Sequence, residues 1–259
     1  MKVRVGQERR TRLDPPAEPA RGPRLLRYRP RVPPAVLRLT RDSLGLAVRE
    51  LAARDPDLAA VVERFGPPPL WDRPEGFATL THIVLEQQVS LASAQAAFDR
   101  LRAAANPLTP GRFLEFDDAQ LLAIGFSRQK AGYVRELARA VDSGAIDPAG
   151  LATLPDDEVR RALVELKGFG PWSASIYLME ALLRPDVWPV GDLALVVAVA
   201  EVKRLATRPD ADRMEALAEP WRPWRSVAAR LFWHDYLCRR GKSLPGQLAD
   251  AAGPEIAAG

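Results

Sequence analysis

Residues 163–177 read LVELKGFGPWSASIY, and residues 187–192, VWPVGD, end in a lone carboxylate, Asp192. The apolar helical run ends near Leu166, and two glycines then bracket a single phenylalanine. Pro171 can open a second helix, because the first turn of a helix leaves the missing proline N–H unused. The pattern predicts a helix, a short hairpin, a second helix and then an acid in a Pro/Gly loop. An ordinary αα-hairpin would carry the same glycines, so the turn alone does not establish a binding site.

The rest of the chain is predicted to be all-α, because apolar residues recur at helical spacing and alternating β-branched runs are absent. Residues 193–200 are apolar throughout and could form a buried strand. The segment continues without a break into residues 201–205 (EVKRL), and the combined length favours a buried helix. Short helices are expected from Ser43 and from Asp55-Pro56. Further helices are expected at about 75–88, 91–104, 117–123, 127–142, 156–166, 171–183, 192–205, 211–218 and 223–239. We divide the chain into an arm (1–34), a helical domain (35–240, with the hairpin at 164–173) and a tail (241–259).

Composition excludes several classes of protein. The chain has 259 residues, one cysteine and two histidines. A single cysteine rules out an internal disulfide and an iron–sulfur cluster held by four thiolates, and two histidines are few for a catalytic metal. No segment resembles a secretory leader or a membrane-spanning helix. The sequence therefore predicts a soluble cytoplasmic protein, associated with the nucleoid if the source is prokaryotic, with no catalytic cofactor and with no membrane partner.

Positive charge is concentrated at the N-terminal end. Residues 1–41 hold twelve Lys/Arg and three Asp/Glu, a net charge of +9, so the remainder carries −5 of the total of +4. The first 34 residues also contain seven prolines, and we interpret them as mostly disordered or extended. Such an arm can add sequence-independent affinity for phosphates. A solvated tail without a role has the same composition.

The hairpin has the chemistry of a phosphate site. Backbone N–H groups at the start of the second helix lack intrahelical partners and lie at the positive end of the helix dipole. Outward carbonyls of the same turn can hold a monovalent cation. Asp192 precedes an apolar helix, where aspartate is most often a plain N-cap. On these grounds Asp192 can be a helix cap, a functional carboxylate, or both.

Four segments resemble one known family. They are residues 166–174 (LKGFGPWSA), 187–193 (VWPVGDL), 83–94 (IVLEQQVSLASA) and 221–233 (WRPWRSVAARLFW). In this order they are similar to the helix-hairpin-helix/Gly-Pro-Asp superfamily of DNA glycosylases, and in particular to its 3-methyladenine DNA glycosylase II branch. The resemblance covers roughly residues 43–240. It implies two helical subdomains with the active-site cleft between them, here without the N-terminal β domain of the founding bacterial member.

The resemblance implies roles for individual residues. Asp192 matches the catalytic aspartate. Trp172 and Trp233 match aromatic positions of the base pocket. Gln88, together with Val89, falls where the family fills the gap left by an extruded base. The positions that match the phosphate-binding amides are Gly168, Gly170 and Ser173, and those that match the carbonyl ligands of a K⁺ or Na⁺ ion are Val164, Leu166 and Phe169.

The chain departs from the family pattern at two of these motifs. Lys167 replaces the usual proline at the start of the hairpin, and Glu86 stands where a small residue is more frequent. Relatives that cleave the DNA strand carry a lysine at the position of Trp172, since a lyase needs an amine nucleophile. The resemblance therefore implies a monofunctional enzyme.

The expected activity is release of alkylated purines of the 3-methyladenine or 7-methylguanine type from double-stranded DNA in base excision repair. The protein would act as a monomer and leave an abasic site. Aromatic faces suit a base that carries positive charge. A neutral lesion needs hydrogen-bond donors and acceptors along the edge of the base, and the motifs offer few such groups. Two alternatives stay open: a glycosylase of the same fold for deaminated or oxidised bases, and a DNA-binding protein without catalysis. Trp71 and Trp188 are expected to anchor loops to the core, and His82 to lie in the wall of the helix that precedes Gln88.

Overall fold

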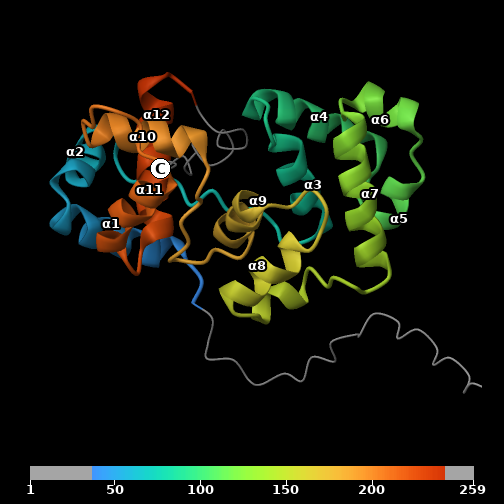
Figure 1. The fold of residues 1–259 in the computed structure, drawn as a ribbon, viewed down its shortest axis with the longest axis horizontal. Helices are drawn as coiled ribbons and strands as arrows, with labels where there is room; N and C mark the ends of the chain where they lie inside the picture. The colour runs from blue at the N-terminus through green and yellow to red at the C-terminus, as the bar shows by residue number, and fades with distance from the viewer. Residues whose placement is uncertain (1–36, 243–259) are drawn as a thin grey trace, which may run out of the picture. The chain divides into compact units, whose positions relative to one another are not determined.

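The computed structural model describes residues 37–242, and within that range it contains helices and no strand (Figure 1). The all-α prediction is confirmed there, whereas the expectations for the arm at 1–34 and for the tail beyond 242 lie outside the described residues. The helices are α1 (Arg41–Arg54), α2 (Pro56–Phe65), α3 (Phe77–Glu86), α4 (Leu91–Ala104), α5 (Pro110–Leu114), α6 (Asp118–Ile124), α7 (Arg128–Asp142), η1 (Gly150–Thr153), α8 (Asp156–Val164), α9 (Pro171–Ile176), η2 (Tyr177–Ala181), α10 (Leu193–Val202), α11 (Ala211–Ala218), η3 (Glu219–Trp221) and α12 (Arg225–Arg239).

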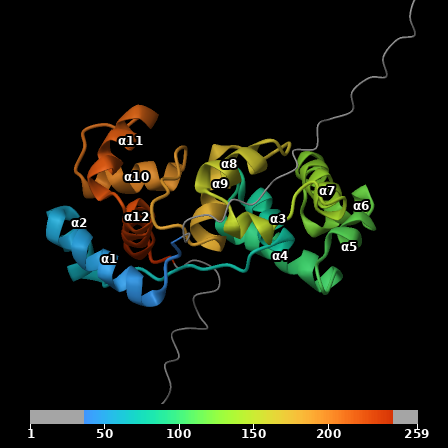
Figure 2. The same ribbon diagram turned by 90° about the horizontal axis from the view of Figure 1, so that it is seen from below.

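The helices of this range pack as two groups. One group joins the two ends of the described chain, because α1 and α2 both contact α12, which also packs on α10. In the other group α3 packs on α4 and α7, and α7 packs on α5 and α6. The pair α8 and α9 lies between the groups in both ribbon views (Figures 1 and 2), and α9 contacts α3. The predicted hairpin therefore lies where the two groups meet.

Polar caps account for where several helices begin. Thr40 and Ser43 form a reciprocal capping box at α1, and Asp117 forms another with Gln120 at α6. Asp192 caps α10. Each side chain satisfies backbone N–H groups that the first helical turn leaves without partners. The N-cap interpretation of Asp192 is thus confirmed.

The structure corrects the helix expected at 171–183. The α-helix ends at Ile176, and η2 is a π-helical turn in which the Leu182 N–H donates to the carbonyl of Tyr177, five residues earlier, at 3.0 Å. A π turn preserves helical spacing of apolar residues, so periodicity cannot distinguish it from an α-helix. Helix α5 was also missed, since its five residues are too few to show a period.

A buried arginine connects the loop before α3 to the rest of this core. Arg230, on α12, is fully buried and donates to the carbonyls of Leu70 at 2.8 Å, Ser226 at 3.0 Å and Met179 at 2.6 Å. Charge-assisted hydrogen bonds to three carbonyls offset part of the desolvation cost of the guanidinium. None of the helices in residues 37–242 has the length and apolarity that a bilayer span requires.

Candidate active site

Asp192 lies at the end of the loop before α10, where three helices meet. Its Oδ1 accepts the backbone N–H of Leu195 at 2.7 Å and the indole N–H of Trp233, on α12, at 3.2 Å. Its Oδ2 accepts the indole N–H of Trp172, on α9, at 2.9 Å. The structure therefore brings together the three side chains that the sequence assigned to the catalytic centre and the base pocket.

The three N–H groups hold this carboxylate in one orientation. Hydrogen bonds to an ionised acceptor are shorter and stronger than those between neutral groups. A carboxylate can accept about four such bonds, and the side chain of Asp192 is only half-buried, so Oδ2 keeps capacity for a water molecule. Both indole N–H groups are used by Asp192, and a ring-face contact with a base stays a prediction.

The hairpin depends on one glycine. Gly168 has φ 88°, in the region that side chains disfavour, and a Cβ there would lie 2.2 Å from the ring of Tyr133, on α7. Gly170 has φ −104° and open space around it, so its backbone does not require glycine. Because Gly170 has no side chain to cap α9, the first-turn N–H groups, Ser173 among them, receive no side-chain cap.

The carbonyls predicted to bind a cation lie in the same turn. The carbonyl of Leu166 accepts the N–H of Phe169 at 3.0 Å, which leaves it one lone pair, while Val164 is half exposed. Within residues 37–242 no three His, Cys, Asp or Glu side chains are grouped so that they could hold a metal ion. Binding of K⁺ or Na⁺ by the hairpin carbonyls stays a prediction.

The end of α3 projects beside the hairpin. Gln87 donates through Nε2 to the carbonyl of Gly168 at 2.8 Å and to the hydroxyl of Ser173 at 3.0 Å. The next residue, Gln88, is exposed and has φ 58°, a conformation that glutamine rarely adopts, and Val89 is 47% exposed. The residues predicted to enter DNA are therefore fastened to the predicted phosphate site through Gln87.

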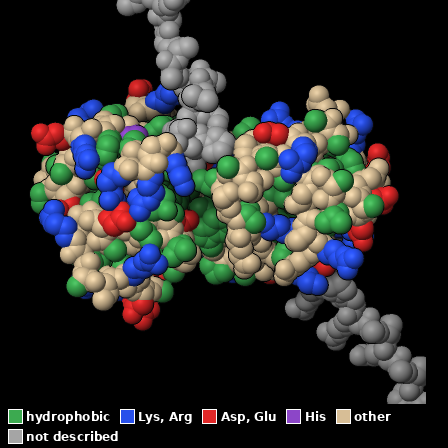
Figure 3. Space-filling model, turned by 90° about the horizontal axis from the view of Figure 1, so that it is seen from above, with side chains coloured by type: hydrophobic (Ala, Val, Ile, Leu, Met, Phe, Trp, Pro, Cys, Tyr) green, Lys and Arg blue, Asp and Glu red, His purple; other side chains and the backbone are tan. Residues whose placement is uncertain are grey.

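Basic side chains near these segments have protein partners. Lys130, at the start of α7, donates to the carbonyl of Leu85 at 2.7 Å, and burial lowers the pKa of its ammonium group. Lys167 is 70% exposed and lies 3.8 Å from the carboxylate of Glu136. Figure 3 shows Lys and Arg side chains on both sides of a hollow with apolar side chains in it. Asp and Glu side chains lie among them on the same face, so an affinity of this face for DNA phosphates stays a prediction.

A buried ionic cluster is the feature that the sequence did not reveal. The guanidinium of Arg73, from the loop before α3, contacts both carboxylate oxygens of Glu86 at 2.7 and 3.2 Å. It also forms a 2.6 Å ion pair with Glu180, on the π turn η2. Burial raises the pKa of the Glu180 carboxyl to about 7, and burial lowers the pKa of neighbouring His82 to about 4. Glu86 was noticed only as a departure from the family, and no signal pointed to Arg73.

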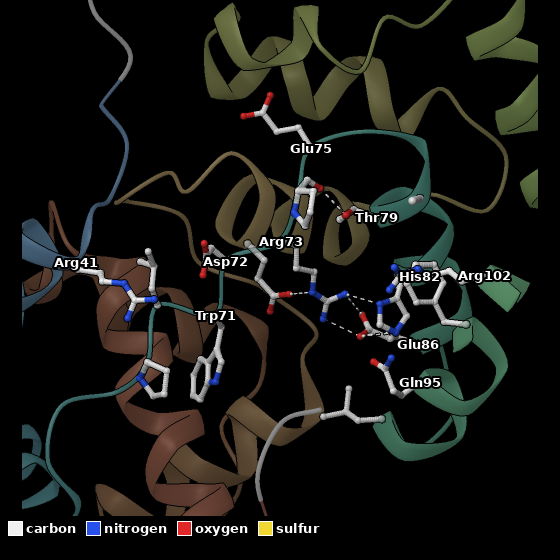
Figure 4. Close-up of a pocket in the computed structure, with 17 residues that line it drawn as sticks. Arg41, Trp71, Asp72, Arg73, Glu75, Thr79, His82, Glu86, Gln95 and Arg102 are labelled. Atoms are coloured by element: carbon white, nitrogen blue, oxygen red, sulfur yellow. Dashed lines mark hydrogen bonds and ion pairs between the residues drawn. The ribbon is translucent and has the colours of Figure 1, made fainter. Parts of the chain in front are cut away.

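This cluster lines a cavity of about 530 Å³ (Figure 4). Trp71, Asp72 and Gln95 contribute other parts of the lining. The lining of this cavity therefore contains several hydrogen-bonding side chains, whereas the expectation about the base pocket stays a prediction. Trp71 packs against Trp233, as expected for a loop anchor, with 6.5 Å between ring centroids.

Comparison with known proteins identifies the family of this chain. Residues 81–223 match the family described as HhH-GPD superfamily base excision DNA repair protein. The chain is 28% identical over 180 residues to DNA-3-methyladenine glycosylase 1 of Schizosaccharomyces pombe. This match covers 68% of this chain and 79% of the S. pombe protein. It is 30% identical over 124 residues to the Bacillus subtilis protein YfjP, but this match covers only 48% of the chain and 43% of YfjP.

Solved structures show the same fold. The S. pombe 3-methyladenine DNA glycosylase Mag1, in complex with abasic DNA, superimposes with a TM-score of 0.68 at 27% identity, over 73% of this chain and 95% of Mag1. The family match spans more than half of the chain and includes both the α8–α9 hairpin and Asp192. The chain therefore belongs to the HhH-GPD superfamily, and its all-α fold is the helix-hairpin-helix glycosylase fold predicted from the sequence.

Proposed function

We propose that this chain is a monofunctional DNA glycosylase that hydrolyses the N-glycosidic bond of alkylated purines. The observation that carries the proposal is the carboxylate of Asp192, held by two indole N–H groups and a backbone amide at the end of the hairpin region. Membership of a base excision repair family and likeness to proteins named DNA-3-methyladenine glycosylase support the same activity.

Double-stranded DNA would bind across the hairpin and the end of α3. Amides of Gly168, Gly170 and Ser173 would hold a phosphate, assisted by a K⁺ or Na⁺ ion on the hairpin carbonyls. Gln88 and Val89, which are exposed next to this turn, would fill the gap in the duplex. Flipping a nucleotide costs a few kcal/mol, so a side chain that replaces the lost stacking lowers that cost.

The chemistry requires little beyond the carboxylate. A purine alkylated at N3 or N7 carries positive charge and leaves readily, so no strong general acid is needed. Asp192 would stabilise the oxocarbenium-like sugar as the bond breaks, and its Oδ2 would orient or deprotonate the attacking water. Its N–H partners are set before the substrate arrives, so little reorganisation is needed during the reaction.

Absence of lyase activity belongs to the same proposal. A Schiff base needs an amine nucleophile next to the sugar. In this chain the position that is lysine in strand-cleaving relatives is Trp172, whose N–H is already bonded to Asp192. The product would be an abasic site in an uncut strand, released by a monomeric protein.

The test measures base release from methylated duplex DNA by the wild type, by Asp192→Asn and by Asp210→Asn. Asp210 is a matched control, because it caps α11 through the N–H of Arg213 just as Asp192 caps α10. Asparagine caps helices as well as aspartate does, so both variants should fold. We expect release by the wild type and by Asp210→Asn only, with strand breaks only after alkali treatment.

Two results would reject the proposal. Release by Asp192→Asn at the wild-type rate would remove the carboxylate from the mechanism. Intact DNA binding with no release by the wild type would favour a non-catalytic DNA-binding protein or another lesion.

A further inference from the structure

We propose that Gln87 is a positioning residue that holds Gln88 in register with the phosphate site of the hairpin, so that gripping the DNA backbone and filling the gap in the duplex occur as one event. The inference rests on the proposed function. It adds a residue that neither touches the substrate nor takes part in bond cleavage. Gln87 acts through Gln88, and its effect is confined to the step in which the damaged nucleotide leaves the stack.

The side-chain amide of Gln87 joins the end of α3 to the hairpin. Its Nε2 donates to the carbonyl of Gly168 at 2.8 Å and to the hydroxyl of Ser173 at 3.0 Å. A backbone carbonyl can only accept, which fixes the orientation of the amide. These acceptors lie 81 and 86 positions further along the chain, so the contact is a tertiary one. Adjacent Cα atoms are about 3.8 Å apart, so the backbone of Gln88 is one residue from this contact.

The contact leaves the predicted phosphate donors unused. Gln87 takes only acceptors from the hairpin, the carbonyl of Gly168 and the hydroxyl of Ser173. The predicted phosphate donors are the backbone N–H groups of the same two residues and of Gly170. The carbonyl of Gly168 is also not one of the three that are predicted to bind a cation. The hairpin can therefore hold Gln87, a phosphate and a cation together.

The residues directly before Gln88 are held from three sides. The carbonyl of Leu85 accepts the ammonium group of Lys130, on α7, at 2.7 Å. Glu86 forms a 2.7 Å ion pair with Arg73, from the loop before α3. The hairpin holds the third residue. Gln88 itself has φ 58°, a conformation that persists only where the surrounding structure imposes it. The residue that would enter DNA is therefore exposed on a preorganised base, which lowers the cost of ordering it on binding.

A purely structural role explains the contact less well. Helix α3 already packs on α4, α7 and α9, and the contacts of Leu85 and Glu86 hold its last turn. Anchoring the helix therefore does not require Gln87. Residues 87–90 connect α3 to α4, and the Gln87 amide fixes this connection relative to the hairpin. Without the amide, Gln88 could shift relative to the phosphate site while both helices stay folded.

The test measures single-turnover release of 7-methylguanine from two duplexes. In one the lesion is paired with cytosine. In the other it faces a tetrahydrofuran abasic-site analogue, so that no base pair has to open. Gln87→Met keeps the length of the side chain and removes both N–H donors, whereas Ser173→Ala removes one acceptor and keeps the backbone amide. Gln120→Met, on α6, is the control, because it also loses an amide hydrogen bond, from the N–H of Asp117 at 2.9 Å. Thermal unfolding checks that the variants fold.

We expect Gln87→Met to slow release from the cytosine-paired duplex about tenfold, the effect of losing one or two neutral hydrogen bonds. Release from the unpaired lesion should slow less than about threefold, because less opening is required there. Ser173→Ala should show a smaller effect of the same kind, and Gln120→Met none. In a Gln88→Gly background Gln87→Met should add little, since the two residues act in one step. Equal slowing on both duplexes, no slowing on either, or an undiminished effect in the Gln88→Gly background overturns the inference and leaves the proposed function standing.

A fluorescence measurement separates the two proposals if no base is released. The probe is the cytosine-paired duplex with 2-aminopurine next to the 7-methylguanine, because 2-aminopurine brightens when its neighbour leaves the stack. A rise with saturating wild type that is smaller with saturating Gln87→Met supports the positioning role even if the proposed function fails. The same rise with both proteins, or no rise with the wild type, overturns it.

Discussion

Gly168→Ala tests whether the hairpin is held in its shape by a lack of space as well as by backbone conformation. An alanine at φ 88° costs about 1 kcal/mol relative to glycine. Its Cβ would lie 2.2 Å from the ring of Tyr133, whereas carbon atoms normally approach to about 3.5–4.0 Å. The ring must move by more than about 1 Å, and such overpacking costs about 1–3 kcal/mol. We therefore expect a loss of about 2–4 kcal/mol in the free energy of unfolding.

Gly144→Ala provides the matched control. Gly144 has φ 72°, and no atom lies within 4 Å of the position that a Cβ would take there, so it reports the backbone cost without the collision. Both variants gain the same small stabilisation from a stiffer unfolded chain. The control should lose about 1 kcal/mol, and the difference between the two variants measures the contact with Tyr133.

Urea unfolding followed by tryptophan fluorescence gives these values, provided that the m-value does not change. Tyr133→Ala in the Gly168→Ala background completes a double-mutant cycle, and removal of the ring should recover at least about 1 kcal/mol of the combined loss. Additive losses, or a Gly168→Ala protein no less stable than Gly144→Ala, would refute the reasoning.

Three further outcomes are expected from the described contacts. The raised pKa of Glu180 (about 7, from 4.5) makes stability fall as pH rises through that window, while the lowered pKa of His82 (about 4, from 6.5) makes it rise. The contributions of these two groups should therefore nearly cancel in the wild type. In Glu180→Gln the contribution of His82 is uncompensated, so the stability of this variant relative to the wild type should rise by about 3 kcal/mol between pH 4 and 6.5 in urea titrations; the same pH dependence in both proteins would contradict this. Asp55→Ala should lose about 2–4 kcal/mol, since it removes the cap of α2 and leaves the buried indole N–H of Trp221 without an acceptor, while Lys203 keeps Asp57 at 3.1 Å. Exposed Arg204→Ala should lose less than about 1 kcal/mol, and equal losses would disprove the distinction. Gln88→Gly should change stability by less than about 1 kcal/mol, because it relieves the positive φ, yet slow base release; undiminished release would exclude Gln88 from base flipping.

Local pattern was sufficient for most of the fold. Helix starts at Pro56, Pro171 and Leu193 follow from proline and aspartate chemistry that acts within one turn. The meeting of Asp192 with Trp172 and Trp233 was expected only through the family resemblance, since no periodicity relates residues 20 and 41 positions away.

The ionic cluster lay beyond sequence reasoning for a physical reason. Arg73, Glu86 and Glu180 come from a loop, an α-helix and a π turn, and only tertiary packing brings them together. Charged residues are ordinarily solvated, so each of them considered alone predicts a surface position. Only the burial of Glu86 and Glu180 in the structure distinguishes them from residues of an ordinary charged surface.

The π turn bears on how the chain between Trp172 and Asp192 tolerates changes of length. Residues 177–181 close with one residue more than an α-helical turn needs. Deletion of one residue there would let an ordinary helix form with little rotation of its flanks, because the π turn spreads about one helical turn over the extra residue. Deletion of one residue between Trp172 and the π turn would instead rotate the indole by about 100° relative to the segment that follows, and would separate it from the carboxylate although neither residue changes. Single-residue deletions should therefore be tolerated better in the π turn than in the part of α9 that precedes it.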